Sequence, residues 1–340
     1  MVLNRRAKLV DVGRVVVESE EVPVPGHSEY LVQVSAVGVC GSDVHYFEHG
    51  KIGSFVVKSP LVLGHEASGV IVGAGPDADQ NRVGRRVAIE PGVPCGRCQQ
   101  CRRGRYNLCP EVRFLATPPI DGAFADYIVH NGDFLHDVSD TVDDVEAALC
   151  EPLSVGIWAN RRVGVTCSDR VLVTGCGPIG LMVAQVAREC GARVILSDVV
   201  QSRLEVAKEL GFEELHSATS APIDESEIAV DVLMECTGVA DVASRGIKTL
   251  TPAGRAVLIG MGPDETQALP VAVIQAKEIV LSGVFRYANT YPTAIGLLER
   301  GRIQVGPIAG TKYSLDDTAA ALRASREDPS CIKPLVVPSL

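Results

Sequence analysis

The first 150 residues alternate apolar and polar positions in short runs. Segments such as RVVVESEEVPVP, EYLVQVSAVGVC and ASGVIVGAGP are rich in valine and are bounded by glycine or proline. A period of two between turn residues is typical of half-buried strands. The pattern predicts an irregular, barrel-like β domain whose loops carry cysteine and histidine.

From about residue 155 the pattern changes to buried strands that alternate with amphipathic helices. DRVLVTGCGPIGLMVAQVAREC and ARVILSDVVQSRLEVAKELG each contain a strand followed by a helix, and VDVLMECTG, GRAVLIGMG and EIVLSGVF supply further apolar strands. Such alternation predicts right-handed βαβ units and a parallel sheet with helices on both faces. After Tyr287 follow two helical stretches and a strand-like tail, CIKPLVVPSL, which we expect to pack back onto the first domain.

Composition narrows the possible functions. Apolar residues make up 46% and charged residues 22% of the 340 residues, as in globular proteins, and the length favours two domains. The formal charge of -10 disfavours binding to nucleic acid or membranes, whose surfaces are polyanionic. The apolar stretch after Lys8 is broken by Asp11, Gly13 and Arg14, whereas a secretory signal needs an uninterrupted apolar core. No segment approaches the ~18 consecutive apolar residues of a membrane span, so we expect a cytoplasmic protein.

A glycine-rich turn follows the first strand of the second domain. GCGPIG, residues 175–180, is a G-x-G-x-x-G pattern that opens a helix. One interpretation of the pattern is a turn between strand and helix that requires glycine and binds no ligand. In this context, however, the glycines allow a tight turn, close approach of the backbone to pyrophosphate and close helix packing. The helix N-terminus also attracts phosphate. The predicted dinucleotide contacts are Gly175, Gly177, Pro178, Ile179 and Gly180.

An acidic residue at the end of the second strand indicates which dinucleotide is bound. Asp198 follows the glycine motif by about 20 residues, where a carboxylate binds the ribose hydroxyls of NAD and repels the 2′-phosphate of NADP. Arg203 lies close behind and is expected to contact the ribose or the adenine, although its charge weakens the exclusion of NADP. NAD is therefore the predicted cofactor.

Four of the eleven cysteines are clustered in one loop. They are Cys95, Cys98, Cys101 and Cys109. Because cytosolic thiols stay reduced, the cluster predicts metal binding, and four thiolates complete the tetrahedral shell of a structural zinc ion. The basic segment RRGR at 102–105 raises the alternative of a nucleic-acid-binding zinc finger. The loop lacks a recognition-helix pattern and lies in an acidic chain, which disfavours that alternative.

A second set of metal-binding residue types is dispersed. Cys40 lies in GVCGSDVHY, His65 and Glu66 lie in LGHEASG, and Glu151 lies in CEPLSVG. Thiolate, imidazole and carboxylate are zinc ligands, and three of them leave a fourth position for water or substrate. Spacing alone does not connect these residues, and a histidine beside a glutamate is more often a surface pair than a ligand pair.

Taken together, these motifs resemble the zinc-containing medium-chain alcohol dehydrogenases, most closely their sorbitol (polyol) dehydrogenase branch. The segments that carry the resemblance are GHEASGVI, CGRCQQCRRGRYNLCP, ATPPIDGAFADY, CEPLSVG and GVFRYANTYPTAI. It implies an α/β Rossmann domain with a parallel six-stranded sheet, residues 154–285, inserted in a GroES-like β-rich catalytic domain, residues 1–153 and 286–340. It also implies zinc- and NAD-dependent oxidation of a secondary alcohol of a sugar alcohol to a ketose.

The resemblance links the dispersed residues into a catalytic zinc site. Cys40 and His65 match zinc ligands, and Glu66 matches the third ligand of the polyol branch. Glu151 stands where many alcohol dehydrogenases have a third cysteine, and which of the two glutamates touches the metal changes with the state of the enzyme. Some animal sorbitol dehydrogenases lack the full cysteine set of the loop, whereas this chain keeps all four. Two Zn²⁺ per chain are therefore expected.

Two routes for the alcohol proton follow from the resemblance. Ser42 and His45 follow Cys40 at the spacing of the alcohol dehydrogenase relay, and a neutral histidine suits that role. In the polyol branch, Glu151 and a water at the open zinc position are the base instead. Alternatively, Ser42 is a helix cap and His45 a solvated side chain.

The resemblance also assigns residues to the ligands. A polyol pocket needs hydrogen-bonding groups, so ethanol is expected to be a poor substrate. The expected substrate contacts are Tyr46, Phe114, Thr117, Glu151, Arg286 and Tyr287. Tyr287 has the alternative role of packing at the domain interface. The expected cofactor contacts beyond the glycine motif, Asp198 and Arg203 are Ile259, Gly260, Met261, Val284, Phe285 and Arg286.

Other functions stay open. A zinc dehydrogenase of the same family that acts on threonine, a butanediol or a primary alcohol would carry the same motifs. A non-catalytic zinc- and nucleotide-binding protein is disfavoured by the intact set of Cys40, His65 and Glu66, since such a protein needs no open metal site. Sorbitol, xylitol and arabinitol all fit the polyol prediction. A homo-oligomer is expected, with a tetramer favoured and a dimer as the alternative.

Overall fold

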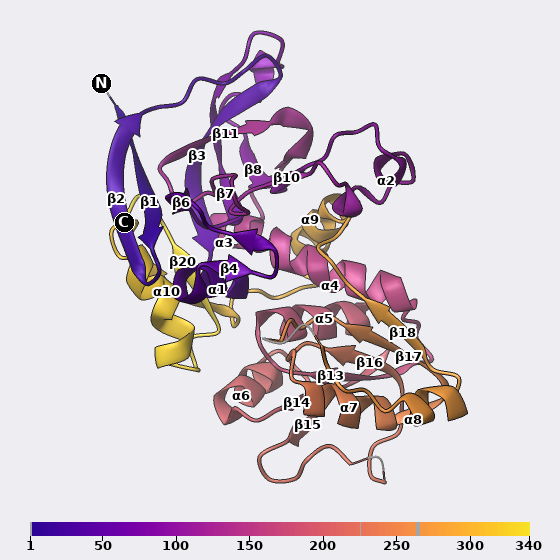
Figure 1. Ribbon diagram of the computed structural model, residues 1–340. Coiled ribbons are helices and arrows are strands. Elements are labelled where there is room, and N and C mark those ends of the chain that lie inside the picture. The colour runs from indigo at the N-terminus through magenta and orange to yellow at the C-terminus, as the bar shows by residue number, and fades with distance from the viewer. Residues whose placement is uncertain (1, 225, 263–265) are drawn as a thin grey trace. The chain divides into compact units, whose positions relative to one another are not determined.

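The computed structural model describes residues 2–224, 226–262 and 266–340. Two units result from the folding of the chain (Figure 1). The first comprises Met1–Glu151, Tyr291–Arg300 and Ala309–Leu340, and the second comprises Pro152–Thr290 and Gly301–Ile308. Among the described residues, no helix combines the length and the apolar character needed to cross a bilayer.

Short and mostly antiparallel strands form the framework of the first unit. Its largest sheet has the order β12-β8-β7-β3-β20-β19, with β11 paired to β3 outside this path. Its strands are β3 (Glu29–Gly38), β7 (Glu66–Ala74), β8 (Arg86–Ile89), β11 (Tyr127–Asn131), β12 (Leu135–Asp137), β19 (Ala309–Tyr313) and β20 (Lys333–Val336). The smaller sheets consist of β1 (Leu3–Asp11), β2 (Arg14–Glu21), β6 (Leu61–Val62), β4 (Lys51–Ile52), β5 (Phe55–Val56), β9 (Gly92–Val93) and β10 (Arg113–Phe114). This β-rich architecture agrees with the irregular β domain that the hydrophobic pattern predicted.

Short helices connect the strands of this unit. They are α1 (Gly41–His49), α2 (Gln99–Arg102), α3 (Asp144–Ala148), α9 (Tyr291–Glu299), α10 (Thr318–Glu327) and the 3-10 turns η1 (Gln80–Arg82), η2 (Tyr106–Leu108) and η3 (Gly132–Phe134). Helix α4 (Cys150–Val163) begins in the first unit and continues into the second. Helix α1 ends at Gly50, whose φ of 67° is the left-handed conformation that glycine adopts without strain.

Alternation along the central strands builds the core of the first unit. Val32 and Val34 on β3 and Ile71 on β7 face inward and are almost completely buried. The chain end joins this sheet, because β20 pairs with β3 in antiparallel register, with Leu335 opposite Gly38. The tail that follows α10 is therefore an internal strand of the sheet, with β19 on its other side.

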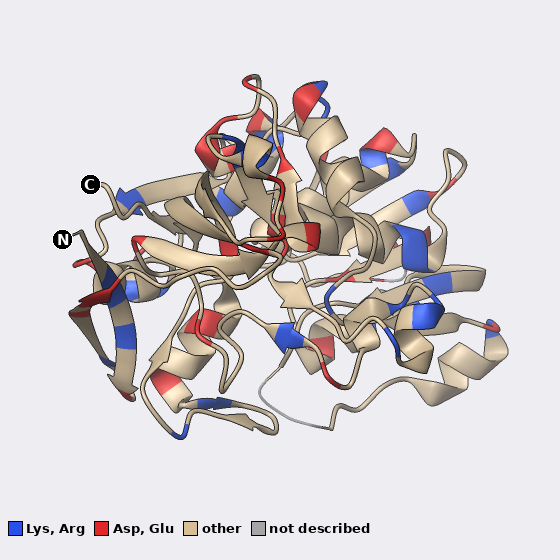
Figure 2. Cartoon of the chain, turned by 90° about the horizontal axis from the view of Figure 1, so that it is seen from above, with Lys and Arg blue, Asp and Glu red and all other residues tan. Residues whose placement is uncertain are grey.

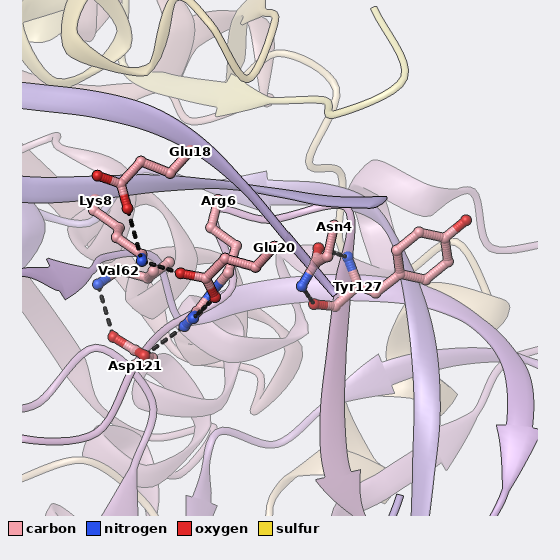
Figure 3. Close-up of polar contacts among 8 residues, drawn as sticks. All are labelled: Asn4, Arg6, Lys8, Glu18, Glu20, Val62, Asp121 and Tyr127. Atoms are coloured by element: carbon pink, nitrogen blue, oxygen red, sulfur yellow. Dashed lines mark hydrogen bonds and ion pairs between the residues drawn. The ribbon is translucent and has the colours of Figure 1, made fainter. Parts of the chain in front are cut away.

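Charged side chains connect the first strand to its neighbours. Figure 2 shows basic and acidic positions close to one another near the N-terminus. Arg6 on β1 pairs with Glu20 on β2 and with Asp121 (Figure 3). Lys8 pairs with Glu18, 3.0 Å away, and with Glu20. Partly exposed ion pairs of this kind contribute little individually, so they fix the pairing of these strands more than they stabilise the fold.

The second unit contains a parallel sheet of six strands in the order β15-β14-β13-β16-β17-β18. The strands are β13 (Arg170–Thr174), β14 (Arg193–Asp198), β15 (Glu214–Ser217), β16 (Val230–Glu235), β17 (Leu250–Leu258) and β18 (Val280–Gly283). The helices between them are α5 (Pro178–Glu189), α6 (Gln201–Glu209), α7 (Ala240–Lys248) and α8 (Val271–Ala276). This order is that of a Rossmann dinucleotide-binding fold, and it confirms the predicted fold class.

Continuous apolar runs explain why the central strands lie inside this sheet. Val171, Leu172 and Val173 on β13 and Leu233 on β16 have no exposed surface, as strands covered on both faces require. The short edge strand β15 is only half buried, and its polar sequence ELHS carries no comparable apolar signal. The carboxyl ends of β13, β14 and β16 lie along one edge of the sheet, where a ligand site is expected in such folds.

Candidate metal and cofactor sites

Cys40, His65 and Glu66 form one group of possible metal ligands in the first unit. One donor atom from each lies within 4.8 Å of the others. Cys40 is the N-cap of α1, His65 ends the loop before β7, and Glu66 is the first residue of β7. His65 and Glu66 are buried, and Cys40 is partly exposed. The donor set of thiolate, imidazole and carboxylate fits a zinc ion, and three ligands leave a fourth position open.

Asp43 contacts two of these three residues, Cys40 and His65. Its carboxylate accepts the backbone N–H groups of Cys40 at 3.0 Å and of Gly64 at 2.9 Å, and one of its oxygens lies 3.6 Å from Nδ1 of His65. Asp43 has no exposed surface. A carboxylate beside a ligand imidazole fixes the orientation of the ring and makes its other nitrogen a better donor. The sequence analysis did not identify this residue.

The charges around His65 favour a cation at its imidazole ring. Burial lowers the pKa of His65, but the Asp43 carboxylate and Cys40 raise it, and the net result lies well above the usual value. The surroundings therefore favour a positive charge at the imidazole. A divalent ion supplies that charge in place of the proton, because metal binding releases ligand protons.

Lys333 on β20 is a second residue that the sequence analysis missed. Its Nζ lies 2.7 Å and 2.8 Å from the two carboxylate oxygens of Glu66 and 2.9 Å from the carbonyl oxygen of Val39. Burial lowers the pKa of Lys333, but Glu66 and, less strongly, Cys40 raise it above its usual value. A cationic side chain is thus buried beside the donor group.

The other predicted catalytic residues lie on α1 and α4. Ser42 and His45 are half buried on α1, where the His45 ring lies 5.6 Å from that of His49. The N-cap of this helix is Cys40, so the alternative role of Ser42 as the helix cap is wrong. Glu151 is 5% exposed in the first turn of α4, and the described donor group within 4.8 Å does not include it.

Besides Glu151, three predicted substrate residues belong to the first unit. The Phe114 ring is tilted against the ring of His65 with 5.7 Å between the centroids, so this aromatic side chain lies beside a metal-ligand candidate. Tyr46 is buried on α1. The backbone N–H of Thr117 donates to the carbonyl oxygen of Phe114 at 3.1 Å. Between these two residues, Ala116 adopts a φ of 57°, so the loop holds a backbone conformation that non-glycine residues rarely adopt.

The second group of possible ligands consists of Cys95, Cys98, Cys101 and Cys109. Their sulfurs all lie within 4.8 Å of one another. Backbone N–H groups of Arg97 and Cys98 lower the pKa of the Cys95 thiol to about 7, whereas burial raises the pKa of Cys101 to about 12. Four sulfurs at this separation fit a closed tetrahedral zinc site, in which no position is left for a substrate.

A buried carboxylate anchors the cysteine loop to the sheet. Oε1 of Glu90 accepts the hydroxyl of Tyr106 at 2.6 Å, and Oε2 lies 2.8 Å from Nε2 of His136. The carbonyl of Glu90 contacts Nε2 of His130 at 2.8 Å. Because Tyr106 lies between the third and fourth cysteines, this network connects the loop to β11 and β12.

The glycine turn has the geometry of a phosphate-binding loop. Gly175 has a φ of 90°, and its N–H donates to the carbonyl oxygen of Ser197 at 2.8 Å. A Cβ on Gly180 would lie 1.8 Å from the carbonyl oxygen of Gly175, so only glycine permits this approach of helix to strand. Gly177 caps α5, and a Cβ there would meet no atom within 4 Å. A helix N-terminus attracts phosphate, because N–H groups of the first turn have no partner within the helix.

Asp198 lies next to this turn. Its Oδ2 accepts the backbone N–H of Cys176 at 2.6 Å, and its Oδ1 accepts that of Val200 at 2.8 Å. These bonds hold the carboxylate at the end of β14. Arg203 lies in the first turn of α6, near enough to Cys176 to lower the pKa of its otherwise raised thiol. Both residues lie beside the glycine turn, and their contact with the adenosine ribose stays a prediction.

The remaining cofactor candidates follow β17 and β18. Ile259 and Gly260 donate their N–H groups to the carbonyl oxygen of Glu235 at 2.8 Å and 3.0 Å, at the end of β16. Arg286 has a φ of 52°, and its guanidinium lies 4.8 Å from the centroid of Phe285. The other candidates in these segments are Met261, which is 63% exposed, half-buried Val284, and Tyr287, which is 3% exposed. Arg286 and Tyr287 belong to the second unit, so their grouping with the substrate candidates of the first unit stays a prediction.

Comparison with known proteins agrees with both units. Residues 26–140 match the alcohol dehydrogenase GroES-like domain, and residues 178–300 match the zinc-binding dehydrogenase domain. The chain is 40% identical over 339 residues to a sorbitol dehydrogenase of Bacillus subtilis, covering 95% of this chain and 94% of the relative. It is 42% identical over 318 residues to the sorbitol dehydrogenase of Gallus gallus, covering 91% of this chain and 89% of the relative.

The fold is also similar to that of a solved structure. The crystal structure of L-idonate 5-dehydrogenase from Escherichia coli has a TM-score of 0.93 at 30% identity, covering 99% of this chain and 98% of that one. The chain therefore belongs to the zinc-binding alcohol dehydrogenases with a GroES-like domain, in their sorbitol dehydrogenase branch.

Proposed function

We propose that this protein is a zinc- and NAD-dependent polyol dehydrogenase that oxidises a secondary alcohol of a sugar alcohol to a ketose. The observation that carries the proposal is the group of Cys40, His65 and Glu66 donors within 4.8 Å of one another. A fully closed ligand set would support structure only, whereas three donors leave room for a substrate oxygen. The membership in the sorbitol dehydrogenase branch supports the substrate class.

The residues of the chain have separate tasks in this reaction. Cys40, His65 and Glu66 hold the zinc ion, and Asp43 keeps the His65 ring in its orientation. When bound, zinc stabilises the negative charge on the substrate oxygen, and NAD accepts the hydride. The glycine turn binds the pyrophosphate at the start of α5, and Asp198 binds the ribose hydroxyls.

The alcohol proton leaves by one of two routes. In the first, the hydroxyl of Ser42 passes the proton toward His45, which lies one turn further along α1. In the second, Glu151 is the base. The variant Ser42→Ala separates them: a large loss of kcat with unchanged zinc content supports the relay, and a small loss supports Glu151. Glu151→Gln is the reciprocal measurement.

A panel of alcohols tests the proposed substrate class. We expect NAD-dependent oxidation of sorbitol, xylitol or arabinitol, with little turnover of ethanol, since a missing hydroxyl leaves polar groups of the pocket unpaired. Turnover of threonine, a butanediol or a primary alcohol without any polyol activity would replace this proposal with another dehydrogenase of the family. Metal analysis of the same preparation is expected to give two zinc ions per chain, and about one would mean that one donor group is empty.

We also infer that the protein assembles into a homo-oligomer, with a tetramer favoured over a dimer. The edge strand β18 supports this inference, because among the described strands β17 is its one partner, and Val280 is 58% exposed. An edge strand with an exposed apolar residue is suited to pairing with another chain. Light scattering during size-exclusion chromatography gives the mass, and a monomeric mass at micromolar concentration would contradict the inference.

A further inference from the structure

Two histidines lie one turn apart on α1 (Figure 1). His45 and His49 begin and end the segment HYFEH, and residues four apart are neighbours on one face of a helix. Their ring centroids are 5.6 Å apart, and the ring planes are inclined by 55°. His45 is half buried, whereas the His49 side chain is 58% exposed, so solvent reaches this ring. The proposed reaction uses His45 in one of its two proton routes and gives His49 no task.

The distance between the two rings fits a shared metal ion. In a tetrahedral zinc site each histidine nitrogen lies about 2.0–2.1 Å from the metal. With about 1.1 Å more to each ring centre, two imidazoles on one zinc ion have centroids about 5.2 Å apart. The observed separation is 5.6 Å, so a small rotation of the exposed His49 side chain closes the difference. Two helical histidines at this spacing also bind zinc in metalloproteases.

The surroundings of His49 favour a cation. It is the last residue of α1, and the carbonyl groups at the end of a helix carry a partial negative charge. The Glu48 carboxylate lies 3.9 Å from Nε2 of His49, and its other oxygen pairs with Arg326 on α10. Arg326 therefore holds the carboxylate near the ring while it offsets part of its charge. Among the described residues, no third Cys, His or acidic donor completes a group of ligands here, so water would fill the remaining positions of a bound ion.

We propose that His45 and His49 form a third, reversible zinc site that inhibits the enzyme. Imidazole nitrogen suits zinc, and two protein ligands hold an ion less firmly than the three or four of the sites described above. This site therefore fills after the other two and responds to the concentration of free zinc. The binding of the ion depends only on the two histidines, whereas the inhibition rests on the Ser42–His45 route of the proposed function.

Zinc at this site removes a proton acceptor. A neutral imidazole has one nitrogen with a free lone pair, and its other nitrogen carries a proton. Once zinc occupies that lone pair, His45 cannot accept the proton that Ser42 passes on. Turnover by this route then stops, while the binding of NADH, which needs no proton transfer, continues. The inhibition therefore lowers kcat and leaves the Kd for NADH unchanged.

The alternative is a pair of surface imidazoles that contact each other and bind nothing. Such a pair would leave the metal content at two zinc ions per chain when more zinc is added. The distinguishing experiment starts from the holoenzyme with its two zinc ions and adds zinc chloride in a citrate buffer that sets the free concentration. Equilibrium dialysis counts the bound zinc per chain, and NAD-dependent oxidation of a polyol gives kcat in parallel.

We expect the unaltered enzyme to bind a third zinc ion and to lose kcat as this site fills. His49→Gln retains the residue of the proton route, so its kcat without added zinc is expected to stay unchanged. This variant should lose the third ion and need at least about tenfold more free zinc for the same inhibition, because the second ligand of a pair binds its ion intramolecularly. The matched control is His27→Gln, which removes another exposed histidine of the same unit, 3.0 Å from Asp77, and should respond like the unaltered enzyme.

A second variant, measured for binding alone, keeps the test decisive. His45→Asn is expected to lose the third ion as His49→Gln does, and its Tm checks that it is folded. Two zinc ions per chain in the unaltered enzyme under excess metal would overturn the inference, and so would equal zinc sensitivity of His49→Gln and the control. A third ion that binds without lowering kcat would overturn the inhibition. An enzyme that oxidises no polyol before zinc is added would contradict the proposed function instead.

Discussion

Gly177→Ala is expected to weaken cofactor binding without destabilising the fold. Gly177 has a φ of -69° and a ψ of -178°, which alanine adopts without strain. The added methyl group would meet no atom within 4 Å, so the folded chain has room for it. In the proposed cofactor site, this space is the one that the pyrophosphate would fill.

Both effects have an expected size. A glycine replaced by alanine at a compatible position stabilises a protein by about 0.4–1 kcal/mol, because the unfolded chain loses freedom. A methyl group forced into a packed contact costs about 1–3 kcal/mol, and a factor of ten in affinity corresponds to about 1.4 kcal/mol. We therefore expect the Kd for NADH to rise by roughly 5- to 150-fold while the cofactor-free protein becomes equally or slightly more stable.

Two measurements on the same preparation check this prediction. Titration of NADH fluorescence gives the Kd, and urea unfolding without cofactor gives the free energy of unfolding. The matched control is Gly306→Ala in the same unit, where a Cβ also meets no atom within 4 Å. A Kd for Gly177→Ala within about twofold of the control would refute the assignment of this turn to the pyrophosphate.

Four other changes have expected outcomes. Gly180→Ala places a Cβ 1.8 Å from the carbonyl oxygen of Gly175 and should lower the free energy of unfolding by about 1–3 kcal/mol in urea, so a neutral result would contradict the packing described. Asp198→Ser should narrow the preference for NAD over NADP in kcat/KM, and an unchanged ratio would remove the ribose assignment. Cys101→Ser should reduce the metal content from two zinc ions to one and lower Tm, since a structural zinc contributes folding energy directly. Glu90→Gln removes the charged acceptor of the loop network and should destabilise the protein by about 1–3 kcal/mol, whereas an unchanged Tm would mean that the network does not anchor the loop.

Local signals made most of the architecture predictable from sequence. The strand before residues 175–180 and the helix after them were predictable because the hydrophobic period changes there. The role of Asp198 was predicted from its distance in sequence to that turn. The spacing of the four loop cysteines predicts that they bind one metal ion together. In each case the residues that act together lie close in sequence, so a short window contains the whole pattern.

The parts that the sequence did not reveal depend on distant contacts. Lys333 lies in an apolar tail where a lysine usually points to solvent, and only the pairing of β20 with β3 brings it to Glu66. Asp43 follows Cys40 by three residues, like a helix-capping acid, and only the fold adds Gly64 and His65 to its contacts. The short strands β15 and β19 are half-exposed and lack a distinct hydrophobic pattern.

The late position of β20 in the chain has a consequence for biosynthesis. Lys333 is translated 267 residues after Glu66, and at about 5–20 residues per second this interval is about 13–53 s. During that time the edge of β3 around Gly38 has no neighbour on one side, and the nascent sheet exposes it to chaperones or to other polypeptides. The Glu66 carboxylate is therefore synthesised well before the lysine that neutralises it.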